Sequence, residues 1–527
     1  MQQADIAAPQ ILAARPAPAH YLARLWTLLP DEGPTITLRL VCYLAALACF
    51  SVAPTLHTRG LVLGPRIGAA LTVISLVAGL LCFYLASRAT LPRWLEGVRP
   101  RGRTLLIATV SGALCASVVS AAVLATLPLT VMRPHHYAND AVTATDCATS
   151  LIMRGHNPYT EFDMGACLTH HDLTALQTTP LQAGAFARTP SYPAPADLTR
   201  VFAQARRDHV RRPAAFESFF NYPAGAFLLP AAFVALGWSD LSSFYLLWAV
   251  LAYGLLALRA PRRWRPWLLA LAGGNVTLWG NAADGQSNLL VIFLILAGWS
   301  TWQRPWLSSA LIGLALATRQ EAWFFAPYYL ILVGRLGSWR GAAARLAVVA
   351  VVCALINAPF IVLSSGAWLH GVLGPLRDPM YPLGEGVIAL ATSGALPLWS
   401  RAAYTGLELA ALVLCLLIYL RTCRRHPGTG LVLALVPLVF AWRSLFTYFY
   451  VALPLLCLWV ILADLAPDRS AWRVDRAQAP ERTRPLLNRS DDSLPAAAAN
   501  KRPRCAGWRD RADAADATRE RAARTAA

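Results

Sequence analysis

The chain has 527 residues, of which 56% are hydrophobic and only 14% are charged, and its mean hydropathy is +0.45. A soluble protein of this length carries about a quarter charged residues, so the composition excludes an ordinary soluble enzyme. The formal net charge of +19 is concentrated in arginines that lie in short links between apolar runs and in the C-terminal tail. The positive-inside rule explains this placement. We therefore predict membrane lipids as partners and no nucleic acid partner.

Long apolar runs predict an all-α integral membrane protein with about twelve transmembrane helices, since each crossing needs about 20 apolar residues. Residues 1–37 are polar and Pro-rich and form the predicted cytoplasmic N-terminal segment, without a cleavable signal peptide. Residues 38–103 hold two N-terminal helices, residues 104–463 the transmembrane core, and residues 464–527 a predicted disordered cytoplasmic tail. The predicted spans are 40–56, 67–87, 104–132, 241–258, 266–283, 287–302, 305–318, 322–334, 346–363, 402–420, 429–442 and 447–463.

Arginine clusters at 88–103, 259–265, 335–345 and 421–425 set the orientation. Placing all four clusters in the cytoplasm puts both termini inside. The long segment 133–220, expected to be helical, and the shorter segment 364–401 then face outward. Residues 222–238 are also apolar, but a full crossing there would turn every later cluster outward. We therefore predict a re-entrant segment, and its prolines fit a broken helix.

Most of the eleven cysteines lie inside apolar runs, where they resemble small hydrophobic residues. Cys147 and Cys167 instead share the large segment 133–220, and they could form a disulfide if that segment lies outside. The chain has no CxxC pair and no zinc-type spacing. The adjacent histidines of the same segment are not at the i, i+4 spacing of a helical metal site, so we predict no metal.

Two aspartates of segment 133–220 are the candidate catalytic residues. Asp140 follows the third predicted span, at the boundary between water and lipid, and Asp146 lies shortly after it. A carboxylate at this boundary could take the proton of an acceptor hydroxyl. The structural alternative is that Asp140 only caps the helix that follows it.

Other polar residues stand where apolar runs begin or end, and such groups are usually functional or paired. Tyr222 opens the re-entrant segment, where it could also be part of an aromatic belt. Asp284, Gln286 and Asn288 separate two spans, and a plain tight turn would explain them equally well. The other candidates for substrate binding are Asn157, Tyr159, Arg319, Glu321 and Arg443.

Arg319 lies at an outward junction, against the positive-inside trend. A guanidinium there could hold the phosphate of a lipid-linked donor through two hydrogen bonds. Arg443, at another outward junction, is a second candidate for anion binding. The structural alternative for Arg319 is an ion pair with Glu321 or with Asp284.

The order of these motifs resembles polytopic glycosyltransferases of the GT-C fold, in particular the bacterial polyprenyl-phosphate-mannose-dependent α-mannosyltransferases and their uncharacterised relatives. The resemblance covers roughly residues 104–463. It rests on Gly155-His156-Asn157-Pro158-Tyr159, Tyr222-Pro223, Gly285-Gln286-Ser287-Asn288 and Arg319. The sequence departs from the family pattern at Ala224, which replaces a second proline, at Arg319, where relatives usually have lysine, and at 383–386.

The resemblance implies a membrane hexosyltransferase with mannose as the default sugar. The donor would be a polyprenyl-phosphate sugar, and the acceptor a lipid, glycan or protein outside the cytoplasm. Asp140, with Asp146 as the alternative, would be the base of an inverting transfer that needs no cofactor. The site would face outward from a bacterial cytoplasmic (inner) membrane and serve the cell envelope. A transporter or flippase is the alternative from another class, although we find no internal repeat of the kind that transporters often show.

Overall fold

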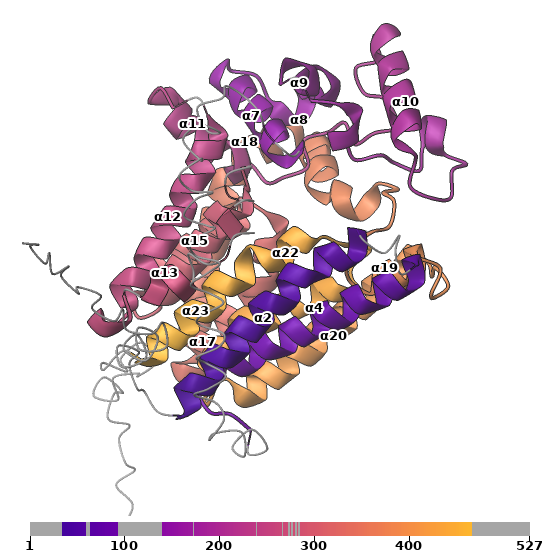
Figure 1. Cartoon of the computed structure of the whole chain (residues 1–527). Helices are drawn as coiled ribbons and strands as arrows, with labels where there is room; N and C mark the ends of the chain where they lie inside the picture. The colour runs from indigo at the N-terminus through magenta and orange to yellow at the C-terminus, as the bar shows by residue number, and fades with distance from the viewer. Residues whose placement is uncertain are drawn as a thin grey trace, which may run out of the picture. The chain divides into compact units, whose positions relative to one another are not determined.

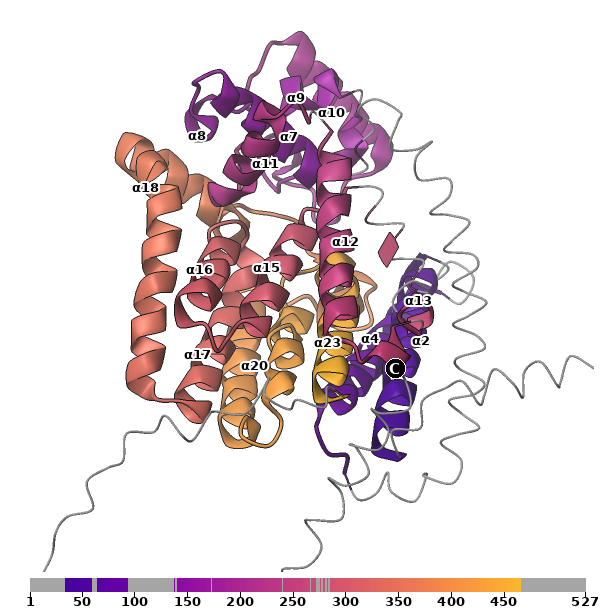
Figure 2. The same cartoon turned by 90° about the vertical axis from the view of Figure 1, so that its left-hand side faces the viewer.

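The computed structural model describes residues 34–58, 64–92, 137, 140–171, 173–238, 240–265, 267–271, 275, 278–279, 282 and 285–465, all in one compact unit. The predicted span 104–132 and nearly all of the tail 464–527 lie outside these residues. Within them the chain is predominantly helical. Figure 1 shows the helices α7 to α10 gathered at one end of the longer helices, and Figure 2 shows the same arrangement from the side.

Six of the described helical segments are long and apolar enough to cross a membrane. They are α2 (Pro34–Thr58), α4 (Pro65–Ser87), α12 (Leu241–Arg259), α18 (Trp339–Arg377), α20 (Arg401–Thr422) and the stretch made by α22 (Phe446–Tyr450) and α23 (Ala452–Leu465). Large apolar side chains on α18 point away from the protein, such as Val362, which is 84% exposed. Exposed apolar surface of this extent fits a lipid environment. The prediction of a helical membrane protein is confirmed, whereas the count of twelve spans stays a prediction.

Several predicted spans form shorter helices. These are α11 (Gly225–Ala235), α15 (Asn288–Ser300), α16 (Pro305–Leu316) and α17 (Phe325–Leu336). A helix of 13 residues, the length of α15, rises only about 20 Å, less than the roughly 30 Å of the hydrocarbon core. The helix α11 has 11 residues and contains Pro230. It lies within the predicted re-entrant segment 222–238, and its entry into the membrane stays a prediction.

Two predicted boundaries differ from the structure. The span predicted at 429–442 is not one helix but η5 (Pro427–Thr429), α21 (Gly430–Leu433) and η6 (Val436–Phe440). Pro437 explains the break, because proline disfavours helical backbone in the residue before it and removes a helical hydrogen bond. The helix α18 runs on to Arg377 beyond a non-helical residue, Ser364. The first part of the segment 364–401 is therefore helical.

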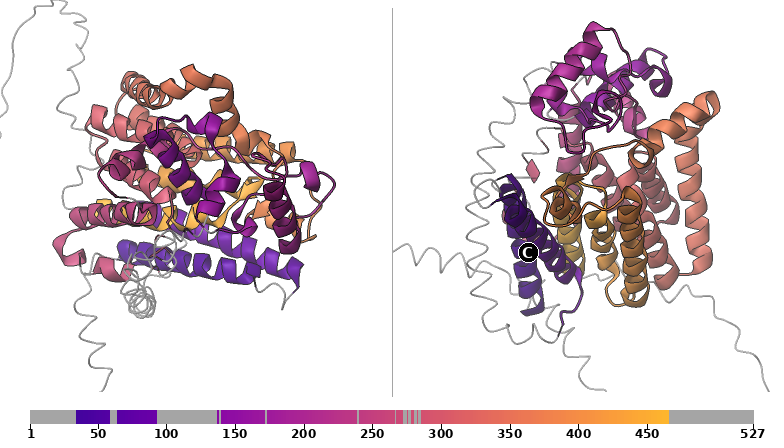
Figure 3. Two further views of the ribbon diagram at one scale, coloured as in Figure 1. Left: turned by 90° about the horizontal axis from the view of Figure 1, so that it is seen from above. Right: turned by 90° about the vertical axis from the view of Figure 1, so that its right-hand side faces the viewer.

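The N-terminal helices α2 and α4 pack along each other and against α23, as the indigo pair in Figure 3 shows. The buried guanidinium of Arg39 on α2 forms an ion pair of 2.9 Å with Asp464 at the end of α23. The hydroxyl of Tyr43 on α2 donates a hydrogen bond to the Leu271 carbonyl. These contacts fasten the two helices to the rest of the described protein.

The segment before α11 is built from short helices. Its main elements are α7 (Asp140–Met153), α8 (Pro158–Glu161), α9 (Met164–His170), η1 (Ala175–Gln177), η2 (Gly184–Phe186) and α10 (Pro195–Arg207). A disulfide joins Cys147 on α7 to Cys167 on α9, as the sequence suggested. Tyr159, Phe220 and Phe227 form edge-to-face ring contacts that make a small apolar core here. The N-terminus of α7 is thereby fixed on a packed scaffold.

The strands β1 (Leu383–Gly384) and β2 (Arg443–Ser444) form a short parallel pair. Leu383 is in register with Arg443, and Gly384 with Ser444. Gly384 has a φ of +132°, and a side chain there would collide with the Ser444 carbonyl. The pairing therefore needs glycine at this position. The pairing also positions the backbone of Arg443.

Candidate active site

Asp140 is the first residue of α7, and its carboxylate accepts a hydrogen bond of 3.1 Å from the Thr179 hydroxyl. Burial raises the pKa of Asp140 above its usual value, while the charge of Arg443, the Thr179 hydrogen bond and the charge of Arg319 act in the opposite direction. Both cations therefore lie close enough to act on the Asp140 carboxylate. A carboxylate of raised pKa facing two cations is suited to take a proton.

Thr179 is held in place by backbone pairing with two other parts of the chain. The N–H of Glu217 donates to the Thr179 carbonyl at 2.9 Å. Pro180 forms an antiparallel bridge with Phe216, and Leu181 forms one with Met380. The hydrogen bond to Asp140 thus depends on residues about 40 and 200 positions further along the chain.

Asp146, the alternative base, has a different environment. Its carboxylate accepts a hydrogen bond of 3.1 Å from the buried Tyr137 hydroxyl and lies 3.2 Å from His171 Nε2. The same Tyr137 hydroxyl accepts a hydrogen bond from the N–H of Leu241 at the start of α12. Asp146 is only 9% exposed. These contacts make it a structural link between α7, α9 and α12, and favour Asp140 as the base.

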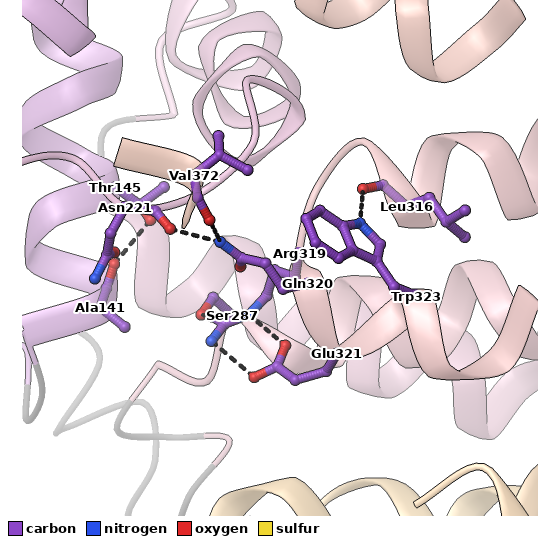
Figure 4. A network of polar contacts seen from close by, with 10 residues as sticks. All are labelled: Ala141, Thr145, Asn221, Ser287, Leu316, Arg319, Gln320, Glu321, Trp323 and Val372. Carbon is purple, nitrogen blue, oxygen red and sulfur yellow. Dashed lines mark hydrogen bonds and ion pairs between the residues drawn. The ribbon is translucent and has the colours of Figure 1, made fainter. Parts of the chain in front are cut away.

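Arg319 lies between α16 and α17 and is almost fully buried. Its Nε and Nη2 atoms donate to the two carboxylate oxygens of Glu321 at 2.8 and 3.1 Å. The remaining nitrogen, Nη1, donates to the Ser287 hydroxyl, and Figure 4 shows these contacts together. The guanidinium also stacks on the Tyr222 ring, 4.5 Å from its centre. The ion pair with Glu321, the structural alternative for Arg319, is thus present.

Gln320 connects this junction to two other segments. Its side-chain amide donates to the Asn221 carbonyl at 2.7 Å and to the Val372 carbonyl at 3.0 Å (Figure 4). Gly225 comes close to the same junction, with its N–H 2.8 Å from the Ala317 carbonyl. A side chain at Gly225 would collide with that carbonyl. This close approach places the Tyr222 ring, just before α11, against the Arg319 guanidinium.

Arg443 differs from Arg319 in its hydrogen bonding. Its Nη1 atom is buried and has no hydrogen-bond partner among the described residues. Its charge acts on Asp140, and it also lowers the pKa values of Tyr192 and Tyr222 against the larger raising effect of burial. Arg443 is therefore the candidate cation with free hydrogen-bonding capacity for an anionic group.

Asn157 and Tyr159, two predicted substrate-binding residues, make structural contacts. The Asn157 side chain accepts a hydrogen bond from the Tyr159 N–H at the start of α8 and donates one to Ser364, where α18 is kinked. The buried Tyr159 hydroxyl donates to the Tyr222 carbonyl at 2.8 Å. The pair therefore orders the segment that presents Tyr222.

The motif before α15 is a turn with a specific glycine. Gly285 has a φ of +78°, and a side chain there would meet Ser242, which explains the glycine. Asn288 begins α15 and is buried, whereas Gln286 is partly buried. Asp284 lies outside the described residues. The position of Ser287 against Arg319 links this turn to the junction at 319.

One group of described residues has the composition of a metal site. Ligand atoms of Cys147, Cys167 and His171 lie within 4.8 Å of one another. The two sulfurs are joined in the disulfide, which removes both thiolates as ligands. We therefore assign no metal to this group.

Two residues that interact with Asp140 were not among the predicted site residues: Thr179 and Tyr192. The sequence contains no local signal for either residue, because contacts between distant segments position them. Backbone pairing holds the chain at Thr179, and the Tyr192 ring packs against the Tyr381 ring.

Residues 219–441 match the model of glycosyltransferase family 87. Comparisons with curated proteins and with solved structures found no match. The matched region contains Tyr222, Gln286 and Arg319 and ends just before Arg443, while Asp140 precedes it. The match indicates a glycosyltransferase and is consistent with the resemblance to a polytopic GT-C-like enzyme.

Proposed function

We propose that the chain transfers a sugar, with mannose as the default, from a polyprenyl-phosphate donor to a lipid, glycan or protein acceptor. One observation carries this proposal. Asp140, Arg319 and Arg443 come from three distant parts of the chain, and both arginine charges act on the Asp140 carboxylate. A base facing a cation with free hydrogen-bonding capacity suits a transfer in which a hydroxyl loses a proton and a phosphate leaves.

In the proposed reaction, the Asp140 carboxylate takes the proton of the acceptor hydroxyl. The hydroxyl oxygen attacks the anomeric carbon, and the bond from that carbon to the phosphate oxygen breaks on the opposite face, which inverts the anomeric configuration. The leaving phosphate departs as an anion, so it needs a positive charge rather than a general acid. Arg443 supplies that charge through Nη1, which has no partner among the described residues.

Arg319 has a supporting role in this mechanism. Its nitrogens are already bound to Glu321 and Ser287, so binding a phosphate directly would require it to leave one of them. In its present position it adds positive charge near Asp140 and holds the Tyr222 ring. Arg443 is thus the main phosphate-binding residue, and Arg319 is the secondary one.

Charge placement supports an outward-facing site in a bacterial inner membrane. The arginine clusters lie at the ends of helices, for example at Arg259 on α12, Arg335 on α17 and Arg421 on α20. The positive-inside rule assigns these ends to the cytoplasm. The segment that carries Asp140 then faces the cell envelope, where lipid-linked donors meet their acceptors.

The alternative of a transporter or flippase loses support from the family match, which indicates a glycosyltransferase. The purified protein in lipid nanodiscs, offered polyprenyl-phosphate mannose, polyprenyl-phosphate glucose and GDP-mannose, tests the proposal. We expect transfer to glycolipid acceptors from a polyprenyl-phosphate donor and none from the nucleotide sugar. Transfer from GDP-mannose alone, or movement of an unchanged lipid-linked sugar across the bilayer, would overturn it.

A further inference from the structure

A cavity of about 380 Å³ lies at the end of α16 and α17 that is remote from Arg319. It is lined by the start of α16, the end of α17 and the start of α18, and both α16 and α17 pack on α18 (Figure 2). Since α16 has 12 residues and rises about 18 Å, the cavity is separate from the candidate active site. Its volume is within the range of roughly 300–1,000 Å³ that is typical of small-molecule sites.

Small residues on α18 create this space. Gly341, Ala344 and Val348 follow one another at spacings of three and four residues, so they lie on one face of the helix. Gly341 and Ala344 leave room between that face and the Trp306 ring, which lines the cavity from α16. The lining is mostly apolar, and Arg345 is the one charged residue among the described residues that form it.

Arg345 is fixed at the cavity by two hydrogen bonds from a single nitrogen. Its Nη1 atom donates to the Trp302 carbonyl at 2.5 Å and to the Tyr329 hydroxyl at 2.9 Å. Within the described part of the chain, its Nε and Nη2 atoms make no hydrogen bond, and the residue is half-buried. Two parallel N–H donors are therefore available to an anion, in the arrangement that suits phosphate oxygens.

The charges around the cavity favour an anionic ligand. The sequences of α16, α17 and α18 contain no Asp or Glu. Arg304 stands directly before α16, and Arg340 lies in the first turn of α18, and both are exposed. Together with Arg345, they give this end of the three helices several cations, while the helices themselves supply no carboxylate to pair with them.

Two exposed tryptophans mark the level of the cavity in the membrane. Trp306 is 74% exposed, and Trp339, which follows Ser338 of the lining, is 56% exposed. Tryptophan gathers at the boundary between lipid and water, and arginine gathers on the cytoplasmic side. In the orientation set by the arginine clusters, the cavity therefore lies at the level of the headgroups of the cytoplasmic leaflet.

We propose that the cavity binds one anionic phospholipid of the cytoplasmic leaflet. Its phosphate accepts hydrogen bonds from Nε and Nη2 of Arg345, and an acyl chain covers Gly341, Ala344 and Val348. Basic pockets between membrane helices are suited to anionic headgroups. A soluble phosphate would satisfy the arginine but leave the apolar lining in contact with water, so the lining favours a lipid. This binding does not depend on sugar transfer.

Titration of the full-length protein in detergent with palmitoyl-oleoyl phosphatidylglycerol, followed by native mass spectrometry, tests the proposal. We expect the wild type to retain one lipid. Ala344→Phe fills the space of the acyl chain and Arg345→Gln removes the charged donors, so each should raise the dissociation constant by about tenfold or more.

Two matched controls separate the cavity from the rest of the surface. Ala343→Phe adds the same ring at the neighbouring exposed position of α18, which does not line the cavity. Arg421→Gln removes an exposed arginine from the last turn of α20. Both controls should stay within about twofold of the wild-type dissociation constant.

Two further ligands identify what the cavity recognises. Phosphatidylcholine should bind at least about tenfold more weakly, because its headgroup has no net charge. Glycerol phosphate, which lacks acyl chains, should not be retained at the same concentration. Equal binding of phosphatidylcholine would overturn the anionic headgroup, and equal binding of glycerol phosphate would overturn the lipid.

The decisive variant is Ala344→Phe, because position 344 is exposed and the change leaves the bonds of Arg345 in place. Unchanged binding of phosphatidylglycerol by this variant, at an unfolding temperature equal to that of the wild type, would overturn the site. If Arg345→Gln does not fold, because it lacks the bonds to Trp302 and Tyr329, Ala344→Phe still decides. The readout is lipid binding, so its failure leaves the proposed function untouched.

Discussion

The Thr179 hydroxyl donates a hydrogen bond of 3.1 Å to the Asp140 carboxylate, although 39 positions separate the two residues in the chain. Burial disfavours the charged form of the Asp140 carboxyl group, whereas the charges of two arginines favour it. The protonation of Asp140 thus depends on contacts from several distant segments, and each contact can be removed separately.

Thr179→Val should move the acid limb of the pH–rate profile to higher pH. A hydrogen bond to the charged form lowers the pKa of a carboxylate, so its loss raises the pKa of Asp140 further. The loss of a charge-assisted hydrogen bond should raise the pKa of Asp140, and with it the acid limb, by roughly one pH unit. The rate on the alkaline side of this limb should stay nearly unchanged. Thr199→Val, on exposed α10 with a bond only to Pro195, is the control, and equal profiles for both variants would contradict the assignment.

Substitutions of Arg443 should separate charge from hydrogen-bond geometry. Arg443→Gln should raise the donor KM or lower kcat by about 10- to 100-fold, because the leaving phosphate loses a charged donor. It should also move the acid limb upward, since the Arg443 charge lowers the pKa of Asp140. Arg443→Lys should keep the limb near its wild-type position while still losing donor affinity. An unchanged donor KM and kcat in both variants would exclude Arg443 from phosphate binding.

Substitutions of Arg319 should act mainly on stability. Arg319→Gln leaves the largely buried Glu321 carboxylate without its bidentate partner. We expect this to lower the free energy of unfolding by about 3 kcal/mol. The double variant Arg319→Gln with Glu321→Gln should recover most of this loss, because no unpaired charge remains. Thermal unfolding in detergent measures both effects. A single variant as stable as the wild type would show that the ion pair does not stabilise the junction.

Reduction of the Cys147–Cys167 disulfide should destabilise the segment around α7. The bond closes a loop over a separation of 20 residues. By restricting the unfolded chain, a loop of this length stabilises the folded state by about 3 kcal/mol. A reductant should lower the unfolding temperature of the wild type but not that of the Cys147→Ser, Cys167→Ser double variant. If the reductant lowers both equally, the bond is not the cause.

The sequence predicted the helical membrane class, because apolar runs and arginine clusters are local signals. It also suggested the disulfide between Cys147 and Cys167. The ion pair between Arg319 and Glu321 was its structural alternative for Arg319. It did not predict Thr179 or the pairing of β1 with β2, since these depend on contacts between distant segments. The span predicted at 429–442 is apolar but broken into η5, α21 and η6, because Pro437 interrupts the helical backbone.

The choice between Asp140 and Asp146 shows the same limit. Both aspartates belong to α7, Asp140 as its first residue and Asp146 in its middle, and the sequence could only rank them by position. The structure distinguishes them by their partners. Asp146 is bound to Tyr137 and His171, whereas Asp140 is bound to Thr179 and its pKa is lowered by the charges of two arginines against the larger effect of burial. Asp146→Asn should therefore lower thermal stability by about 1–3 kcal/mol, because it disturbs a buried hydrogen-bonded group.

The most direct test of the account is sugar transfer by Asp140→Asn from a polyprenyl-phosphate donor in nanodiscs, with Asp146→Asn measured alongside. We predict that Asp140→Asn loses at least about 10²-fold in kcat while its unfolding temperature is equal to or above that of the wild type, because a buried charge is removed. Asp146→Asn, once folded, should keep most of its kcat. Full transfer by folded Asp140→Asn would contradict the central claim.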